Sequence, residues 1–448
     1  MLKRKIDERL RRHFETSKSA LLVTGARQIG KTYSVREFGK NFRSFVEINF
    51  AENPDAADAF KTASSNADVL LRLSAIAAAP LIKGETLIFF DEVQLCPEIV
   101  TAIKFLVEEG SYRYILSGSL LGVELHDLRS EPVGYMDVIE MFPLDFEEFA
   151  RCAGVSETVW GNLRDAWSRR VPADAFVHAK MMELFRLYLV VGGMPEAVVR
   201  YFESNNLQKV AEAQRAILRL YKRDITRYDR GNKLRIEEIF ELIPPELNAK
   251  NKRFILKNLN ENAKFGRYEN GFLWLKNAGV ALPVYNVEEP KAPLLLARSR
   301  NLFKLFQSDV GLLACQYAEG IQLKIITGSD DVNFGAVFEN AVAQELTAHG
   351  FALYYYNSKK RGEVDFLVES GGNVLPVEVK SGKSYATHRA LANIMTCAEY
   401  AIPEALVLCG ENLRREGKIL YAPVYMAAFL AKETAAPEFY KIDLSALR

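Results

Sequence analysis

Cysteine is scarce in this chain of 448 residues, and no two cysteines stand at the spacing of a metal-binding pair. The five cysteines lie far apart along the chain, at Cys96, Cys152, Cys315, Cys397 and Cys409. This pattern excludes a CxxC zinc motif and a dense disulfide framework, and it is typical of a reducing compartment.

Long apolar runs are also missing. No stretch approaches the roughly 18 apolar residues of a membrane span, and the charged N-terminal stretch lacks the apolar core of a signal peptide. We therefore expect a cytoplasmic protein with no membrane partner.

Net charge is nearly absent, because 58 Lys and Arg residues face 57 Asp and Glu residues and leave a formal charge of +1. No global field draws such a protein to nucleic acid, so that partner would need a local basic patch. The length predicts two or three globular domains.

A phosphate-binding pattern follows a short apolar strand near the N-terminus. Leu21–Val23 leads into GARQIGKT, which matches GxxxxGK[ST] at every fixed position. Glycines let the loop turn its N–H groups toward a phosphate, while Lys31 neutralises the β- and γ-phosphates of ATP and Thr32 binds Mg²⁺. A glycine turn can match by chance, but the strand and helix context favours a nucleotide site. The residues expected to bind ATP are Gly25, Ala26, Arg27, Gln28, Ile29, Gly30, Lys31, Thr32 and Tyr33.

A second strand is expected to deliver carboxylates to the same sheet edge. The apolar run 87–90 ends in Asp91 and Glu92, as a buried parallel strand does when it reaches a ligand at its carboxyl end. We expect Asp91 to hold Mg²⁺ through water, and Glu92 to polarise the attacking water. The alternative is a strand followed by a solvated acidic turn.

A third strand, 114–116, ends in Ser117-Gly118-Ser119. Ser119, in preference to Ser117, is our candidate for sensing the γ-phosphate, and a plain strand-end turn is the alternative. Farther on, 176–200 and 207–221 have apolar residues at helical spacing and predict a helical lid. Gly192-Gly193-Met194-Pro195 is expected to end one helix and to start another, with proline in the first turn.

The C-terminal part predicts a hairpin with a charged face. Glu378 and Lys380 differ by two positions and project from one face of a strand, and a Gly371-Gly372 turn brings Asp365 opposite them. Glu339 can reach in from a flanking helix. Three carboxylates form a hard-oxygen Mg²⁺ site, and Lys380 would orient or deprotonate a water, as phosphodiester hydrolysis requires. Exposed Glu and Lys are common in hairpins, so a site that binds without cutting stays open.

A basic segment precedes this hairpin, with Lys250, Lys252, Arg253, Lys257, Lys264 and Arg267. Positive charge beside helix ends favours contact with a DNA backbone. The alternative is a solvated helix face. Helices are expected at 234–243, 252–259 and 268–277, followed by a wing strand at 280–287.

The motifs GARQIGKT, FFDEVQ, ILSGSLLG and FPLDFEEF resemble those of uncharacterised bacterial and archaeal AAA-family ATPases, over nearly the whole chain. In that family the ATPase is fused to a C-terminal domain of unknown function. The resemblance implies a winged helix in the middle, a nucleotide contact at Pro195 and a PD-(D/E)XK nuclease-like C-terminal fold. Many relatives have an arginine where Tyr135 stands, so the arginine of the transition-state site is unassigned, with Arg129 and Arg223 as candidates.

We therefore expect an α/β multidomain protein with a P-loop AAA-type ATPase domain at 1–160 and a helical lid at 161–230. A winged-helix-like segment at 231–324 and a nuclease-like domain at 325–448 follow. The leading hypothesis is ATP-regulated binding or Mg²⁺-dependent cleavage of DNA. The first alternative is a nucleotide-dependent switch or transcription-type regulator with a non-catalytic nuclease-like domain. A third, a motor, requires a homo-oligomeric ring.

Overall fold

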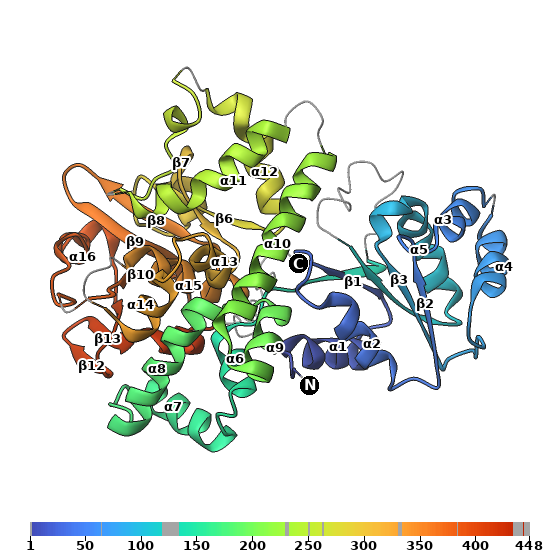
Figure 1. The fold of residues 1–448 in the computed structure, drawn as a ribbon, viewed down its shortest axis with the longest axis horizontal. Helices are drawn as coiled ribbons and strands as arrows, with labels where there is room; N and C mark the ends of the chain where they lie inside the picture. The colour runs from blue at the N-terminus through green and yellow to red at the C-terminus, as the bar shows by residue number, and fades with distance from the viewer. Residues whose placement is uncertain are drawn as a thin grey trace.

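The computed structural model describes residues 2–63, 65–118, 134–228, 233–249, 251–261, 264–329, 334–382, 384–432 and 442, without the side chains of 66, 227, 228, 233 and 234. Two β-sheets lie at opposite ends of the molecule, and a group of helices stands between them (Figure 1). No helix in these ranges is long and apolar enough to cross a membrane.

The N-terminal sheet is parallel throughout, in the order β2-β3-β4-β1-β5. Its strands are β1 (Ala20–Thr24), β2 (Ser44–Asn49), β3 (Thr86–Asp91), β4 (Arg113–Ser117) and β5 (Met136–Glu140). Because all strands run the same way, the carboxyl ends of β1 to β4 meet at one edge of the sheet. This is the parallel sheet expected for the N-terminal part.

Helices cover both faces of this sheet: α1 (Lys5–Thr16), α2 (Lys31–Gly39), α3 (Pro54–Lys61), α4 (Asn66–Ile76), α5 (Pro97–Glu109) and the short η1 (Val93–Leu95). Alternate strand residues enter separate cores, as the strand period of two requires. Leu21 and Val23 pack with residues of α1 and α2, while Ala20 and Leu22 pack with those of α3 to α5. Burial on both faces accounts for the continuous apolar run before Asp91.

The expected lid is helical: α6 (Phe146–Cys152), α7 (Glu157–Arg169), α8 (Ala175–Val191), α9 (Pro195–Ser204) and α10 (Leu207–Tyr228). Asp145 and Glu148 form a capping box that starts α6. The predicted break between two helices is confirmed, since α8 ends before Gly192 and Pro195 stands in the first turn of α9.

The second sheet is mixed and has the order β12-β13-β11-β10-β9-β8-β6-β7. Its strands are β6 (Ala281–Val287), β7 (Arg298–Gln307), β8 (Tyr354–Ser358), β9 (Gly362–Ser370), β10 (Asn373–Val379), β11 (Ala405–Cys409), β12 (Arg414–Glu416) and β13 (Ile419–Pro423). The predicted hairpin is confirmed, because Ser370 pairs with Asn373 across Gly371 and Gly372, which both have positive φ.

The middle segment differs from the expected winged helix in two ways. Its predicted wing strand is β6, but β6 pairs with β8 of the C-terminal part. The hairpin β6–β7 therefore extends the C-terminal sheet. As a result, the domain boundary expected after residue 324 divides one sheet. The helix predicted at 252–259 is wrong, since Lys252 has a φ of +45° and only the short η3 (Leu256–Asn258) forms. The flanking helices are α11 (Lys233–Asn248) and α12 (Phe265–Asn277).

Shorter helices complete this part: α13 (Val310–Cys315), α14 (Ile321–Thr327), α15 (Gly335–Ala348), α16 (Arg389–Met395), η4 (Leu294–Ala297), η5 (Ala398–Tyr400) and η6 (Val424–Phe429). α15 packs on β7 and β10. One continuous apolar core includes Leu21 and Phe89 of the first sheet, Tyr188 of α8 and Phe366 of the second sheet. The two sheets therefore share a core through the helices between them.

Candidate functional site

The loop after β1 has the backbone of a phosphate-binding turn. Gly25, Gln28 and Gly30 have φ angles of +134°, +66° and +93°, and α2 begins at Lys31. At Gly25, a side-chain Cβ would lie 2.2 Å from the carbonyl oxygen of Met141. Only glycine fits there, because both the φ angle and the close approach exclude a side chain.

Lys31 is buried inside this loop. Its Nζ donates hydrogen bonds to the carbonyl oxygens of Gly25 (2.9 Å) and Ala26 (2.8 Å). Burial lowers the pKa of Lys31 to about 8, although the nearby Glu92 and Asp91 oppose that shift. The ammonium is therefore held by weak neutral acceptors, which a charged phosphate oxygen can replace with a stronger bond.

Asp91 collects polar groups at the carboxyl edge of the sheet, from the start of α2 and from the ends of β2 and β4. Its Oδ2 accepts hydrogen bonds from Thr32 Oγ1 (2.9 Å) and from Asn49 Nδ2 at the end of β2 (3.2 Å). Its Oδ1 accepts from the Ser117 hydroxyl at the end of β4. The sheet thus brings Thr32 and Asp91 together as predicted, and a hydroxyl beside a carboxylate offers the hard oxygen ligands that Mg²⁺ prefers.

Two of these neighbours were missed. Asn49 ends β2, a half-buried strand whose alternating pattern SFVEIN could have been recognised. Ser117, rather than the preferred Ser119, touches Asp91, and Ser119 lies outside the described residues. A polar residue at the end of each parallel strand was the available signal.

Glu92 follows Asp91 with a φ of +58°, an uncommon left-handed conformation for a residue with a side chain. Its backbone N–H donates to Asp91 Oδ1 (3.1 Å), and Gln94 Nε2 donates to its carboxylate. Strained backbone of this kind is maintained by the surrounding structure and is frequent at functional sites. The carboxylate is half-buried beside the loop of Lys31.

The lid reaches the loop through Pro195 and α10. A Cβ placed on Gly30 would lie 3.7 Å from Pro195 Cγ. Arg27 forms an ion pair with Asp224 of α10 (2.9 Å), and the Tyr221 hydroxyl donates to the Arg27 carbonyl oxygen (3.1 Å). Tyr33, the last of the predicted contacts, is half-exposed at the start of α2.

A cavity of about 720 Å³ opens where Gln28 faces α9 and α10. Four basic residues line it, and only two acidic residues, Glu196 and Glu212, oppose them. The basic residues are Arg200, Lys209, Arg219 and Arg223. The cavity can accept an anion next to the loop. Arg223 is therefore in place for such a contact, whereas Arg129 lies outside the described residues.

The break between α8 and α9, residues 192–195, is called the lid break below. Close packing requires glycine at its first two positions. A Cβ at Gly193 would lie 2.0 Å from the carbonyl oxygen of Leu144, and one at Gly192 would lie 2.3 Å from Asp309 Oδ1. Gly193 accepts a hydrogen bond from Leu144 N–H (2.7 Å) and donates one to Asp309 Oδ2 (2.6 Å). The break therefore joins the segment before α6 to the loop between β7 and α13.

Arg4 is a buried residue near the loop. The sequence did not reveal its role, because it lies in a stretch with many charged residues. Its guanidinium donates to Ile29 O (3.0 Å) and Phe142 O (2.7 Å) and pairs with Glu148 (3.0 Å). Arg4 therefore connects the phosphate-binding loop to the segment before α6 and to α6 itself. At the position expected to hold arginine, the Tyr135 hydroxyl instead donates to Glu108 (2.6 Å).

The predicted carboxylates of the second sheet do gather. Asp365 Oδ2 accepts a hydrogen bond from Val379 N–H (2.9 Å), and Lys380 Nζ pairs with Glu378 (2.7 Å). Burial raises the pKa of Glu378 to about 8, and Asp365 and Glu339 add to that rise while Lys380 opposes it. Burial and Asp365 raise the pKa of Glu339 as well.

Lysines from the middle segment enter this cluster, which the sequence did not predict. Lys304 of β7 is fully buried, and its Nζ lies 2.7 Å from Glu363, 3.7 Å from Glu339 and 3.8 Å from Asp365. Burial lowers the pKa of Lys304, but these carboxylates outweigh that effect and raise it. Lys252 also pairs with Glu339.

These ammonium groups lie among the carboxylates that were expected to hold Mg²⁺. Among the described residues, Glu339, Asp365 and Glu378 do not form a group with ligand atoms within 4.8 Å of one another. In this arrangement the cluster is neutralised by lysine and does not fit a metal ion.

The basic segment is only partly available to an outside partner. Lys252 points inward to Glu339, whereas Lys257, Lys264 and Arg267 are exposed. Lys250 lies outside the described residues. Three exposed cations around η3 and α12 remain from the predicted patch.

Comparisons with known families agree with the geometry of the first sheet. Residues 17–150 match the model of an AAA domain. Residues 182–323 and 334–425 match two domains of unknown function, DUF8612 and DUF4143. No curated protein sequence matches the chain at a significant level.

Several solved structures have a similar arrangement at low identity. The Walker-type ATPase paby2304 of Pyrococcus abyssi is 14% identical, with a TM-score of 0.43 over 70% of this chain and 96% of that one. The Aeropyrum pernix Orc1 protein, solved in complex with DNA, is 13% identical, with a TM-score of 0.27 over 72% and 91% of the two chains. Cdc6p from Pyrobaculum aerophilum is 10% identical, with a TM-score of 0.26 over 72% and 92%. By the family models, the chain has an AAA domain in its N-terminal part, followed by two domains of unknown function.

Proposed function

We propose that this protein is an ATP-hydrolysing switch whose nucleotide state controls the C-terminal carboxylate cluster and its contact with DNA. The observation that carries the proposal is the position of the lid break. Pro195 lies against Gly30 of the phosphate-binding loop. Two residues before Pro195, Gly193 forms backbone hydrogen bonds with Leu144 and with the carboxylate of Asp309. One short segment, 192–195, therefore touches both the nucleotide loop and the second half of the chain.

The nucleotide chemistry follows from the groups at the sheet edge. Lys31 would leave the carbonyl oxygens of Gly25 and Ala26 to neutralise the β- and γ-phosphates of ATP. Thr32 and Asp91 would hold Mg²⁺, which neutralises phosphate charge when bound. Glu92 would polarise the attacking water, and Ser117 and Asn49 would orient Asp91. The backbone from Gly25 to Thr32, with Tyr33 and Pro195 beside it, would form the rest of the site.

The cavity beside Gln28 is where we place the response to ATP. An anionic γ-phosphate at the loop would attract the unbalanced cations Arg219 and Arg223 of α10. It would also compete with Asp224 for Arg27, whose ion pair now holds α10 to the loop. Either change moves α10 relative to the loop, and the lid break with it.

The effector would be the cluster of Glu339, Asp365, Glu378 and Lys380. Exposed Lys257, Lys264 and Arg267 supply the positive charge for a DNA backbone. In the described state Lys304 and Lys252 neutralise the carboxylates. Binding without cleavage is therefore the function that the geometry supports best.

Cleavage of DNA is the second candidate, because Asp365 of β9 and Glu378 of β10 lie near Lys380, directly after β10, as a hydrolytic site would need. It requires nucleotide-driven removal of Lys304 from the carboxylates.

One experiment separates the two candidates. The protein and its Asp365→Ala and Lys31→Ala variants are incubated with single-stranded, duplex and branched DNA, with Mg²⁺ or Mn²⁺ and with or without ATP. The switch predicts ATP-dependent DNA binding, lost in Lys31→Ala, and no cleavage. Cleavage lost in Asp365→Ala establishes the nuclease. Neither binding nor cleavage of any DNA form contradicts both candidates.

A further inference from the structure

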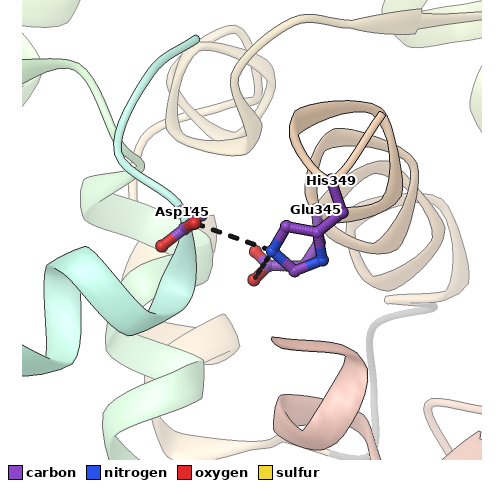
Figure 2. Close-up of side chains that lie close together, drawn as sticks. All are labelled: Asp145, Glu345 and His349. Carbon is purple, nitrogen blue, oxygen red and sulfur yellow. Dashed lines mark ion pairs between the residues drawn. The ribbon is translucent and has the colours of Figure 1, made fainter. Parts of the chain in front are cut away.

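Asp145, Glu345 and His349 meet where the ATPase domain touches the C-terminal half of the chain (Figure 2). Asp145 caps α6, directly after the FPLDFEEF motif begins, and Glu345 and His349 lie at the end of α15. One oxygen or nitrogen atom of each side chain lies within 4.8 Å of the other two. Asp145 and Glu345 are buried, and the His349 side chain is 11% exposed.

Each carboxylate is oriented by a backbone N–H. Glu148 N–H donates to Asp145 Oδ1 (2.9 Å), and Phe146 N–H donates to Glu345 Oε2 (3.0 Å). The second oxygens, Asp145 Oδ2 and Glu345 Oε1, are the ones that face His349 Nε2. Glu345 Oε1 is buried and has no hydrogen-bond partner in the described part of the chain. A hydrogen bond from a neighbouring group to a ligand side chain orients that side chain toward a metal ion.

The spacing matches a metal site better than a set of hydrogen bonds. His349 Nε2 lies 3.6 Å from Asp145 Oδ2 and 3.6 Å from Glu345 Oε1, beyond the roughly 2.7–3.2 Å of a hydrogen bond. With zinc–nitrogen and zinc–oxygen bonds of about 2.0–2.2 Å, neighbouring ligands of a tetrahedral site stand about 3.3–3.5 Å apart. A small rotation of the side chains closes that difference.

We propose that Asp145, Glu345 and His349 bind a zinc ion that fastens α15 to the start of α6. One neutral imidazole and two carboxylates balance the charge of Zn²⁺, and water completes the fourth position. His349 has the most exposed side chain of the three, so the ion would enter from its side. The ion links the ATPase domain to the helix that also bears Glu339 of the carboxylate cluster.

Lys5 is the cation that competes for this position. Its Nζ lies 2.5 Å from Asp145 Oδ2 and 2.9 Å from Glu147. Glu147 offers it a second carboxylate, so Lys5 can remain paired when zinc takes Asp145 Oδ2. Loss of the Lys5 charge therefore strengthens zinc binding.

To test this proposal, the full-length protein is first treated with a chelator. It is then titrated with zinc near neutral pH, and binding is measured by calorimetry. Substitution with Co²⁺ then reports the geometry, through the visible bands of tetrahedral cobalt. The wild type is expected to bind one zinc ion per chain. His349→Ala should weaken binding at least as much as loss of an outer-shell partner does, about 10- to 100-fold.

Two further variants keep the test decisive. His388→Ala removes a histidine bonded to Tyr421 on another surface and should bind zinc like the wild type. Lys5→Ala should bind zinc more tightly, whereas a purely ionic cluster would lose stability without gaining affinity for zinc. Absence of zinc binding by the wild type, or equal binding by His349→Ala, overturns the proposal. ATP binding by each variant shows that the fold is intact.

Discussion

At the scale of single residues, Asp91 depends on neighbours that no local pattern of the sequence connects. Thr32, Asn49 and Ser117 reach it from the ends of three other segments, because a parallel sheet brings its carboxyl ends to one edge. The P-loop and the Asp91-Glu92 pair could be predicted, since their spacing is local. Asn49 could have been found only as a polar residue at the end of a strand. Arg4 could not be found, because its contacts arise from long-range pairing.

Glu92→Gln is expected to slow ATP hydrolysis by about 10²- to 10⁴-fold, the contribution of a general base, while ATP binding is retained. The amide keeps the size of the side chain and its bond with Gln94 but cannot accept a proton. Steady-state hydrolysis and calorimetric titration with ATP measure the two effects. A variant that hydrolyses ATP at the wild-type rate would remove Glu92 from the mechanism.

Lys304→Met is expected to destabilise the fold by about 3–5 kcal/mol, because it leaves buried carboxylates without their cation. Urea unfolding measures the loss, and Lys264→Met, at an exposed lysine, should stay within about 0.5 kcal/mol of the wild type. If Mn²⁺ restores the stability of Lys304→Met, the cluster can still accept a metal. An unchanged unfolding free energy would show that Lys304 does not neutralise the cluster.

At the scale of elements, the sequence predicted the break between α8 and α9 but not the residues that the break contacts. Glycine and proline predicted the break itself, as α8 and α9 confirm. They did not predict its partners, Leu144 and Asp309, which come from distant segments. The wing strand was likewise recognised as a strand, but its pairing with β8 is a tertiary contact that periodicity cannot encode.

Gly193→Ala should destabilise the protein by about 1–3 kcal/mol, the typical effect of overpacking. The added Cβ would lie 2.0 Å from the backbone oxygen of Leu144, and backbone cannot move aside like a flexible side chain. Gly161→Ala is the matched control in α7, where nothing lies within 4 Å, and it should stabilise by about 0.5–1 kcal/mol. Thermal and urea unfolding compare the two, and equal stability of both variants would exclude close packing at Gly193.

Asp309 should give this junction a measurable pH dependence. Burial raises its pKa from 3.8 to about 6, although the N–H groups of Gly193 and Leu312 oppose the rise. Between these values the folded state keeps a proton that the unfolded state has lost. The contribution of Asp309 to stability is therefore full below pH 3.8 and is lost as the pH rises to about 6.

Asp309→Asn removes that titration, so its stability relative to the wild type should improve as the pH rises through this window. Urea unfolding of both proteins at several pH values measures the difference. A difference that stays constant with pH would show that Asp309 is ionised in the fold throughout.

At the scale of the whole molecule, a set of contacts connects the phosphate-binding loop to α15. The lid break touches the phosphate-binding loop at Gly30 and bonds to Asp309. Gln344 of α15 donates from Nε2 to the Tyr188 hydroxyl (2.9 Å), which in turn donates to Leu144 O (2.8 Å). The switch requires both ends of this path to bias one equilibrium.

Hydrogen exchange of the full-length protein, with and without Mg·ATP, tests this claim most directly. We expect ATP to change exchange in α9, in α15 and in the hairpin β9–β10 of the wild type, and to change nothing there in Lys31→Ala. A change confined to the phosphate-binding loop and the first sheet would contradict the switch and leave an ATPase without control over its C-terminal half.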